Sequence, residues 1–111
     1  GRFQRVQDVV LEMDIVLERN TTWLMKLAAD YDAGKDVREQ AAKVKIDSSR
    51  AASKLLLEAM EICGGVAGLD EFGLIRHHND LFVTRVGEGS NRALHTFCVR
   101  PLFSEISRSL Q

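Results

Sequence analysis

Two glycine-rich turns carry the residues of this chain that are best placed to hold a ligand. They are residues 64–68 (Gly-Gly-Val-Ala-Gly) and residues 87–90 (Gly-Glu-Gly-Ser). Glycine lets the backbone approach a bound molecule closely, and it destabilises a fold where that freedom is not needed. The second turn also holds a lone carboxylate, Glu88, between two glycines. We therefore expect the 64–68 turn and the 87–90 turn to face one ligand.

Each turn also has a purely structural interpretation. Glu88 could be a solvated glutamate in the first turn of a helix, where its negative charge suits the helix dipole. A helix often ends on a single glycine, so Gly64 alone could be a C-terminal cap. Two successive glycines, Gly64 and Gly65, favour a ligand over a cap.

The composition is that of an ordinary globular protein of one domain. The chain has 111 residues, of which 45% are apolar and 28% charged, and this length suffices for one hydrophobic core. The net charge of −1 gives no electrostatic reason to bind nucleic acid or an anionic membrane. No apolar run approaches the roughly 18–20 residues of a membrane span, and no signal peptide begins the chain, so we expect a protein that is not secreted. A start other than methionine suggests a processed chain or an excised fragment.

The cysteines and histidines form no metal-site pattern. Cys63 and Cys98 are too few for a disulfide framework, and their spacing to the histidines matches no zinc motif. We interpret both as buried residues of a reducing compartment, either the bacterial cytoplasm or the mitochondrial matrix. His77 and His78 point about 100° apart on a helix and cannot share a metal as a pair four residues apart would. We expect surface or interface positions for these two, and for His95 an interface position rather than the role of a proton shuttle.

The first predicted helix runs from residue 3 to about residue 30. Its apolar residues recur at spacings of three, four and seven, which places them in one stripe, although residues 20–22 (Asn-Thr-Thr) weaken the pattern. Gly34 in the following turn can cap this helix at its C-terminus. The predicted stripe consists of Val6, Val9, Val10, Met13, Leu17, Leu24 and Ala28.

The second predicted helix runs from residue 37 to about residue 63 and ends at the 64–68 turn. Asp36 can serve as its N-cap, and Glu39 three residues later can close a capping box. Residues 47–49 (Asp-Ser-Ser) could divide this helix by providing a second N-cap. We favour a single long helix with these three residues facing solvent.

Two shorter helices follow. Asp70 can cap a third helix that extends to about Arg85, and either Ser90 or Asn91 can cap a fourth. Pro101 lies within the fourth helix and should bend it or divide it near residue 100. No stretch alternates as a β-strand would, so four helices with short connections predict an all-α, up-and-down four-helix bundle. The expected interior residues of the fourth helix are Leu94, Phe97, Cys98, Leu102 and Ile106.

Three segments together resemble the C-terminal domain of the acyl-CoA dehydrogenase family. Residues 60–68 resemble its Gln-x-x-Gly-Gly-x-Gly loop, residues 76–80 its Arg-Asp pair, and residues 87–90 its Glu-Gly-Thr turn. The spacings match the family pattern without a gap, and the resemblance spans essentially the whole chain. It implies that residues 1–111 are a single helical bundle domain, with the N-terminal helical domain and the middle β-domain of such an enzyme absent.

The resemblance implies a reaction and its catalytic base. The family removes two hydrogens from an acyl thioester: a carboxylate takes the α-proton while the β-hydrogen leaves as a hydride to FAD. Glu88 falls on the position of this base in most members, and Gly89 lies with it on the substrate side. Backbone N–H groups, that of Glu88 among them, would polarise the thioester carbonyl as an oxyanion hole does.

The resemblance also implies an FAD site shared between subunits. Residues 61–65 fall where the family holds the adenine side of a neighbouring subunit's FAD, whereas the 87–90 turn serves the flavin of its own subunit. Ser90 replaces the usual threonine, and Arg92, which stands where the family often has a glutamine, could pair with a phosphate or face solvent. The expected cofactor-binding residues are Glu61, Ile62, Cys63, Gly64, Gly65, Ser90 and Arg92.

Some residues depart from the family pattern. Glu61 replaces the family's glutamine, and its carboxylate would repel a pyrophosphate. Ala67 replaces the third glycine of the loop, and Asn79 replaces the arginine of the Arg-Asp pair. These changes indicate a divergent member with an unusual substrate or a weakened flavin site.

The leading hypothesis is the C-terminal domain of an FAD-dependent acyl-CoA dehydrogenase of fatty acid metabolism. Its substrate would be an acyl thioester of CoA or of a carrier protein, and we expect these 111 residues alone to be inactive. The resemblance implies a homotetramer and an electron-transfer flavoprotein as electron acceptor, with no nucleic acid or membrane partner. One alternative is a non-catalytic helical oligomerisation partner of such an enzyme, which the departures at Glu61, Asn79 and Arg92 favour and the presence of Glu88 opposes. The other alternative is a related flavin oxidase.

Overall fold

The computed structural model describes residues 1–87 and 89–111, apart from the side chains of Arg2, Val66 and Asp70. No strand occurs in these residues, so the predicted all-α fold class is confirmed. The α-helices are α1 (Arg2–Asp32), α2 (Arg38–Cys63), α3 (Leu74–Val86) and α4 (Asn91–Ser109). Two short 3-10 turns, η1 (Gly64–Gly68) and η2 (Asp70–Phe72), join α2 to α3.

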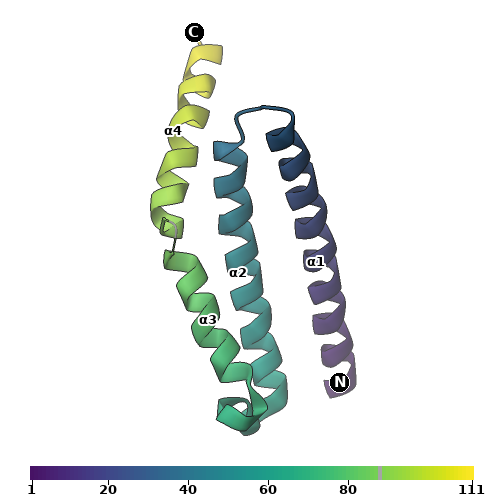
Figure 1. Ribbon diagram of the computed structural model, residues 1–111. Helices are drawn as coiled ribbons and strands as arrows, with labels where there is room; N and C mark the ends of the chain where they lie inside the picture. The colour runs from purple at the N-terminus through teal and green to yellow at the C-terminus, as the bar shows by residue number, and fades with distance from the viewer. Residues whose placement is uncertain (88) are drawn as a thin grey trace.

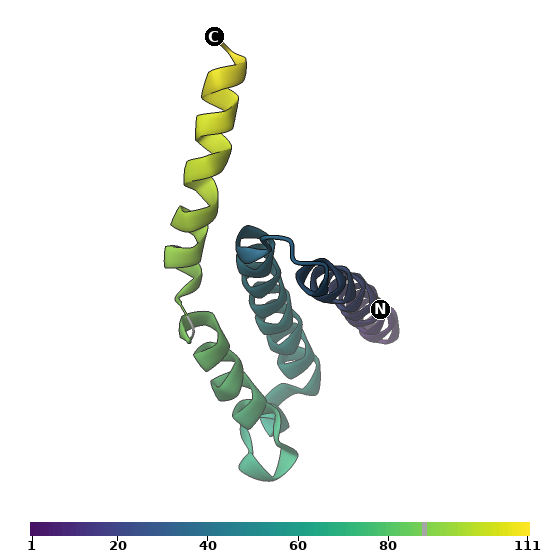
Figure 2. The ribbon, with the colours of Figure 1, turned by 45° about the horizontal axis from the view of Figure 1, so that its top comes forward.

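The long helix α2 is the centre of the arrangement and packs against each of the other three α-helices. α1 runs antiparallel to α2, and α3 and α4 follow one another in a single direction along another side of α2 (Figure 1). A second view shows α1 and the α3–α4 column on different sides of α2 (Figure 2). The chain therefore runs up, down and up, and residues 87–90 join the two helices of the last column.

The face of α1 that packs on α2 differs from the predicted stripe. Val10, Leu17 and Leu24, which the periodicity places inside, are more than half exposed. The prediction for these residues is wrong because α1 carries two apolar stripes about 100° apart, and only one of them meets α2. The less exposed residues alternate at spacings of four and three, typical of closely aligned helices, and are Val9, Met13, Val16, Asn20, Trp23, Leu27 and Asp30.

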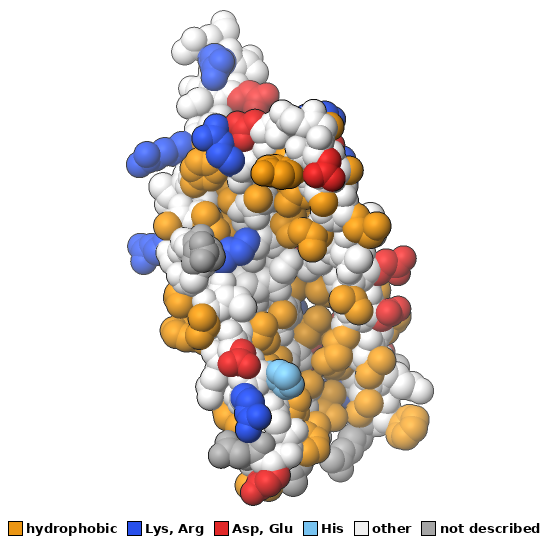
Figure 3. Space-filling view, in the orientation of Figure 1, with side chains coloured by type: hydrophobic (Ala, Val, Ile, Leu, Met, Phe, Trp, Pro, Cys, Tyr) orange, Lys and Arg blue, Asp and Glu red, His pale blue; other side chains and the backbone are white. Residues whose placement is uncertain are grey.

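The other stripe of α1 is left uncovered by the described residues. We call it the outer stripe, and its members follow each other at intervals of seven residues. They are between 55% and 81% exposed: Phe3, Val10, Leu17, Leu24 and Tyr31. Apolar side chains also run along the face of the molecule above α2 and its borders with α1 and α3 (Figure 3). Exposed apolar surface of this kind is typical of interaction sites for proteins, membranes or ligands.

α2 is one uninterrupted helix, as predicted, but its polar segment does not face solvent. Ser49 is buried, and Asp47 and Ser48 are half-buried. The Ser49 hydroxyl accepts a hydrogen bond from the side chain of Asn91 on α4, and Asp47 pairs with Arg19 on α1. The predicted exposure is wrong because α2 is packed on several sides, and Ser49 and Asp47 each find a partner on a neighbouring helix.

Glycines end α1 and α2 as predicted. Gly34, with a φ of 81°, follows the last turn of α1, and its N–H donates to the carbonyl of Tyr31. Gly64, with a φ of 70°, is the C-cap of α2, and its N–H donates to the carbonyl of Met60. Both φ values lie in the left-handed range that favours glycine.

The start of α2 is capped differently from the prediction. Val37 occupies the N-cap position, while the Asp36 carboxylate accepts from both the backbone N–H and the guanidinium of Arg38. The hydrogen bond from the guanidinium, followed by that from the backbone, lowers the pKa of Asp36 from 3.8 to about 2. Glu39 pairs with Lys43 one helical turn away. The predicted capping box is therefore wrong, because both carboxylates are engaged by basic side chains instead.

α3 and α4 begin at different kinds of residue. Asp70 starts the short turn η2, and Gly73, with a φ of 85°, is the N-cap of α3. The prediction that Asp70 caps α3 is therefore wrong, because the intervening 3-10 turn moves the helix start past Gly73. The serine cap of α4 is confirmed: Ser90 Oγ accepts from the N–H of Ala93 at 3.2 Å.

α4 continues through Pro101 as one helix, so the predicted division near residue 100 does not occur. Of its expected interior residues, Cys98 is buried and Leu94 half-buried. The second half of α4 extends past the end of α2 (Figure 2), where it has little to pack against. Leu102 and Ile106 in this half are accordingly 48% and 44% exposed, and the prediction of an interior position is also wrong for Phe97 in the first half, which is 46% exposed beside a groove.

Candidate functional site

The chain around the 87–90 turn is fixed to α2 by three polar residues. Lys45 Nζ donates to the carbonyl oxygen of Gly89 at 2.5 Å and to Asn91 Oδ1 at 3.1 Å. Asn91 is buried, and its Nδ2 donates to Ser49 Oγ at 2.7 Å. Lys45 and Ser49 are four residues apart, so both project from one face of α2. We call Lys45, Ser49 and Asn91 the anchor.

The glycines of the 87–90 turn are closely packed by their own chain. A Cβ atom on Gly87 would lie 3.1 Å from the carbonyl oxygen of Val83. A Cβ atom on Gly89 would lie 3.3 Å from Leu94 Cδ2, and the φ of Gly89 is 96°. A Cβ atom would therefore be tightly packed at both positions, and at Gly89 the left-handed φ also favours glycine. Glu88 lies outside the described residues, and its role as catalytic base stays a prediction.

Ser90 and Arg92 stand at the start of α4 beside the anchored turn. The Ser90 hydroxyl oxygen already accepts from a backbone N–H, and its hydrogen is left for a second partner. The Arg92 side chain is exposed. The fold brings Gly89, Ser90 and Arg92 to one helix N-terminus, and their contacts with a cofactor or substrate stay predictions.

The 64–68 turn is open, whereas the 87–90 turn is closely packed. A Cβ atom on Gly64, Gly65 or Gly68 would meet no atom within 4 Å. Gly64 has a φ that favours glycine, but Gly65 does not. Neither backbone conformation nor packing within the described residues therefore requires a glycine at position 65. Ala67, at the position of the family's third glycine, is buried, so its methyl group packs inward.

Glu61 is paired with a residue that the sequence pattern did not single out. Arg5 on α1 donates to Glu61 Oε2 at 2.8 Å, and both side chains are exposed. This guanidinium offsets the negative charge beside the 64–68 turn, which reduces the repulsion expected between Glu61 and a phosphate. Ile62 and Cys63, the remaining predicted residues here, are half-buried at the end of α2.

The register of the α1–α2 hairpin could have predicted the contact between Arg5 and Glu61. Arg5 pairs with Glu61, and Arg19 pairs with Asp47. Both pairs lie symmetrically about Ala33, as antiparallel helices joined by a short turn require. Opposite charges equally distant from the predicted turn are therefore candidates for contact across the hairpin. Lys45, by contrast, contacts a segment that the hairpin does not contain, and no comparable local signal points to it.

The two turns are far apart on one chain. Lys45 holds Gly89, and Gly64 caps the far end of the same helix. At about 1.5 Å per residue the two positions are separated by roughly 28 Å along α2. Figure 1 shows the 64–68 turn at one end of α2 and the start of α4 partway along it. This separation argues against a single small ligand that touches both turns of one chain.

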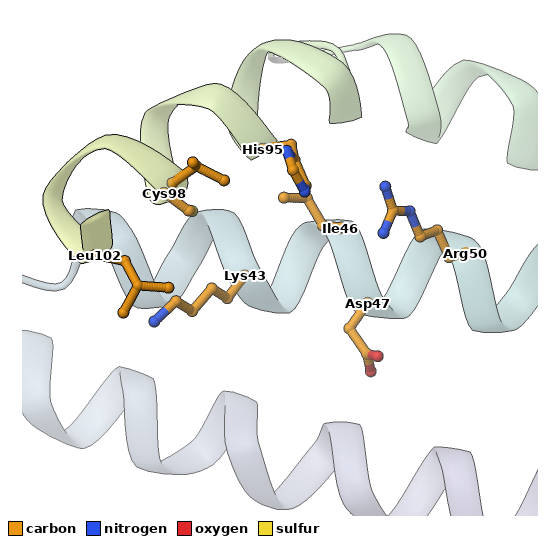
Figure 4. Close-up of a pocket in the computed structure, with 8 residues that line it drawn as sticks. Lys43, Ile46, Asp47, Arg50, His95, Cys98 and Leu102 are labelled. Atoms are coloured by element: carbon orange, nitrogen blue, oxygen red, sulfur yellow. The ribbon is translucent and has the colours of Figure 1, made fainter. Parts of the chain in front are cut away.

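A groove between α2 and α4 lies near the anchor. Figure 4 shows Lys43, Asp47 and Arg50 on α2, with His95 pointing towards α2 from α4. The groove has a volume of about 240 Å³ and apolar walls that include Cys98. It is smaller than the roughly 300–1,000 Å³ of typical small-molecule sites. His95 is exposed in this chain, and the interface position predicted for it stays a prediction.

The described residues contain no metal site and no membrane helix. No group of three or more histidine, cysteine, aspartate or glutamate side chains among them could hold a metal ion. His77 is exposed and His78 half-buried. Cys98 is buried as predicted, while Cys63 is only half-buried, because it lies in the last turn of α2. Within the same residues, no helix is long and apolar enough to cross a membrane.

Comparisons with known proteins agree on one family. The family described as "Acyl-CoA dehydrogenase, C-terminal domain" matches residues 1–100. The L-prolyl-[peptidyl-carrier protein] dehydrogenase of Serratia sp. is 31% identical over 91 residues, which are 82% of this chain and 24% of the relative. The mitochondrial short-chain specific acyl-CoA dehydrogenase of Bos taurus is 32% identical over 92 residues, 81% of this chain and 22% of the relative.

A solved structure agrees with the sequence relatives. The structure titled "FAD complex of PigA" has a TM-score of 0.82 and 29% identity, and the match covers 92% of this chain and 27% of that chain. The chain thus spans about a quarter of the length of the relatives that it matches. The resemblance drawn from the three sequence segments is confirmed, and the chain belongs to the acyl-CoA dehydrogenase family.

Proposed function

We propose that this chain is the C-terminal domain of an FAD-dependent dehydrogenase that acts on an acyl thioester, with Glu88 as the catalytic base. The observation that carries the proposal is the anchored 87–90 turn. Lys45 and Asn91 fix the residues that directly follow Glu88, and two closely packed glycines flank it. A solvated surface glutamate would need neither feature.

The task of Glu88 is to take the α-proton of the thioester. A general base must lie within hydrogen-bond reach of the proton that it removes, and a held turn keeps it there without loss of entropy at each turnover. The first backbone N–H groups of α4 carry the partial positive charge of the helix dipole. Directed at the thioester oxygen, they would stabilise the negative charge that develops as the proton leaves.

The residues at both turns fit FAD, which when bound supplies the acceptor for the β-hydride. The open backbone of Gly64 and Gly65 leaves room for a cofactor to approach, and Arg5 offsets the carboxylate of Glu61. At the other turn, Ser90 and the exposed Arg92 stand beside the start of α4. The structure titled "FAD complex of PigA" supports FAD as the cofactor.

The two turns would serve two copies of FAD in an oligomer. The roughly 28 Å along α2 between Lys45 and Gly64 supports this division. The outer stripe of α1 supports an assembly in which further segments or subunits cover the bundle. We propose a homotetramer, in which the 64–68 turn reaches the FAD of a neighbouring subunit.

The substrate class is an acyl thioester of CoA or of a carrier protein. One relative is named a short-chain specific acyl-CoA dehydrogenase and another an L-prolyl-[peptidyl-carrier protein] dehydrogenase, at 32% and 31% identity. The two identities are nearly equal, so both carriers belong in the proposal. Electrons would pass to an electron-transfer flavoprotein, and a CoA substrate would place the enzyme in fatty acid metabolism.

The test uses the longer protein that carries this domain. Its flavin absorbance is recorded before and after mixing with acyl-CoA and acyl-carrier thioesters, for the unchanged protein and for Glu88→Gln. We expect bound FAD in both, and reductive bleaching that is at least about 100-fold slower in the variant. Glu105→Gln, which changes an exposed glutamate of α4, is the control and should bleach normally.

Two results would contradict the proposal. Unchanged bleaching in Glu88→Gln with FAD retained would remove Glu88 from the mechanism. A longer protein without flavin would favour the non-catalytic oligomerisation partner. The isolated 111-residue chain should bind FAD weakly and show no turnover, since most of the flavin site would lie outside it.

A further inference from the structure

We propose that Lys45 is a positioning residue, which sets the place of the catalytic turn through its hydrogen bonds to Gly89 and Asn91. Ser49 also contributes, because its hydroxyl oxygen accepts a hydrogen bond from the amide nitrogen of Asn91. This inference rests on the proposed role of Glu88 as the base. It adds residues that touch neither substrate nor cofactor but decide where the base lies.

The bonds of Lys45 all run from α2 to the segment that follows Glu88. Its ammonium group donates to Gly89 O at 2.5 Å and to Asn91 Oδ1 at 3.1 Å. Hydrogen bonds from a charged donor are stronger than those between neutral groups. Lys45 also lines a groove between α2 and α4 together with Ala42, Leu94 and other residues.

Helix stability alone does not explain a lysine at this place. The N-terminus of α4 carries partial positive charge, so a cation beside it is electrostatically unfavourable for the helix. The ammonium group nevertheless bonds to the carbonyl of Gly89, two residues before the helix begins. What the contact achieves is to fix that carbonyl, and with it the backbone next to Glu88.

The buried half of the anchor orients Asn91. Asn91 is 7% exposed and Ser49 is 5% exposed. The amide oxygen of Asn91 faces Lys45, and the amide nitrogen donates to Ser49 Oγ at 2.7 Å. A buried polar network in which every member is satisfied favours one arrangement over others. The start of α4 is thus tied to two places one helical turn apart on α2.

The anchor matters because a glycine restricts its own backbone less than any other residue does, and both Gly87 and Gly89 lie between α3 and α4. The two helices meet end to end there, and α2 is the element alongside both (Figure 1). Without the bonds of Lys45, the turn could shift against α2 while both helices remain folded. A shift of this kind would move the base and leave the rest of the site in place.

The test compares variants of Lys45 in the longer protein. Lys45→Met keeps an apolar stem and removes the charge and both hydrogen bonds, whereas Lys45→Arg keeps a cation with several donors. We expect Lys45→Met to lower kcat by about tenfold to 100-fold, the cost of a misplacement of about 1 Å, with KM and flavin content unchanged. Lys45→Arg should retain most of the original kcat. Lys54→Met, at an exposed lysine of the same helix, should not change kcat.

A second measurement separates positioning from general damage. In the Glu88→Gln background, Lys45→Met should leave the residual rate unchanged, because the base that it positions is already absent. Ser49→Ala keeps Lys45 and removes the hydroxyl that accepts from Asn91 and donates to Ile46 O, so it should lower kcat less than Lys45→Met. If Lys45→Met fails to fold, the kcat of Ser49→Ala tests the positioning role instead.

The failures of the two proposals can be told apart. An unchanged kcat in Lys45→Met together with an inactive Glu88→Gln would overturn the positioning role alone. Equal losses of flavin and kcat in Lys45→Met would show a structural role and would also overturn it. Full activity in Glu88→Gln would instead overturn the proposed function on which the inference rests.

Discussion

The two glycine-rich turns are alike in sequence and opposite in surroundings. At the 87–90 turn, the chain's own atoms lie 3.1 Å and 3.3 Å from where side chains on Gly87 and Gly89 would begin. At the 64–68 turn, no atom lies within 4 Å of the same point on any of the glycines. The 87–90 turn is also tied to the central helix α2 by the anchor.

This difference separates two reasons for a glycine. Where the chain crowds the missing side chain, as at Gly89, the fold itself requires the glycine. Where nothing crowds it and φ is not left-handed, as at Gly65, the described residues give no reason for a glycine. The proposed function supplies one, a cofactor that approaches the backbone. The ion pair of Arg5 with Glu61, next to the open turn, supports the same interpretation.

The largest effect on the fold is expected for Gly89→Ala. An alanine at a φ of 96° is strained, and its Cβ would press on Leu94 Cδ2. We expect the free energy of unfolding of the 111-residue chain to fall by about 1–3 kcal/mol, measured by urea denaturation. Gly68→Ala is the matched control, since it meets no atom within 4 Å and has no left-handed φ. Equal stabilities of the two variants would remove the contrast between the turns.

A smaller effect on stability, but a clear one on cofactor binding, is expected for Gly65→Ala. Its free energy of unfolding should stay within about 0.5 kcal/mol of the original or rise slightly, since alanine restricts the unfolded chain. In the longer protein, the added methyl group should weaken FAD binding about tenfold, or about 1.4 kcal/mol. The measurement is flavin content after dialysis against decreasing FAD. Undiminished flavin binding would mean that the open turn does not serve the cofactor.

The smallest effect is expected at the third connection, between α1 and α2, where Asp36 bonds to Arg38, two residues away, and to no other described side chain. The folded pKa of Asp36 is about 2, below its ordinary value of 3.8. Its contribution to stability is therefore present above pH 3.8 and is lost as the pH falls towards about 2. Both side chains are exposed, so the contribution is small.

Thermal unfolding of Asp36→Asn across this range checks the sign. The variant should melt slightly below the original chain at pH 7 and together with it at pH 2. A difference that grows on acidification would contradict the assignment. The result would also give a baseline for a turn that has neither a buried anchor nor an open ligand face.

Much of the local structure follows from the sequence alone. The four helices, the glycine ends of α1 and α2, and the serine cap of α4 depend on residues within one or two turns of each other. Such short-range preferences act before any helix meets another. The family was also recognised from local segments, since the residues of its motifs are adjacent in the chain.

Only the tertiary structure decided which faces meet. The outer stripe and the α2-facing stripe of α1 are both apolar, and packing against α2 selected the one that contains Val9 and Met13. Ser49 is buried because Asn91, which lies 42 residues away in the chain, satisfies its hydroxyl. Lys45 reaches Gly89 across a similar interval. Contacts of this range depend on how whole helices pack, and neither periodicity nor spacing within one helix contains that information.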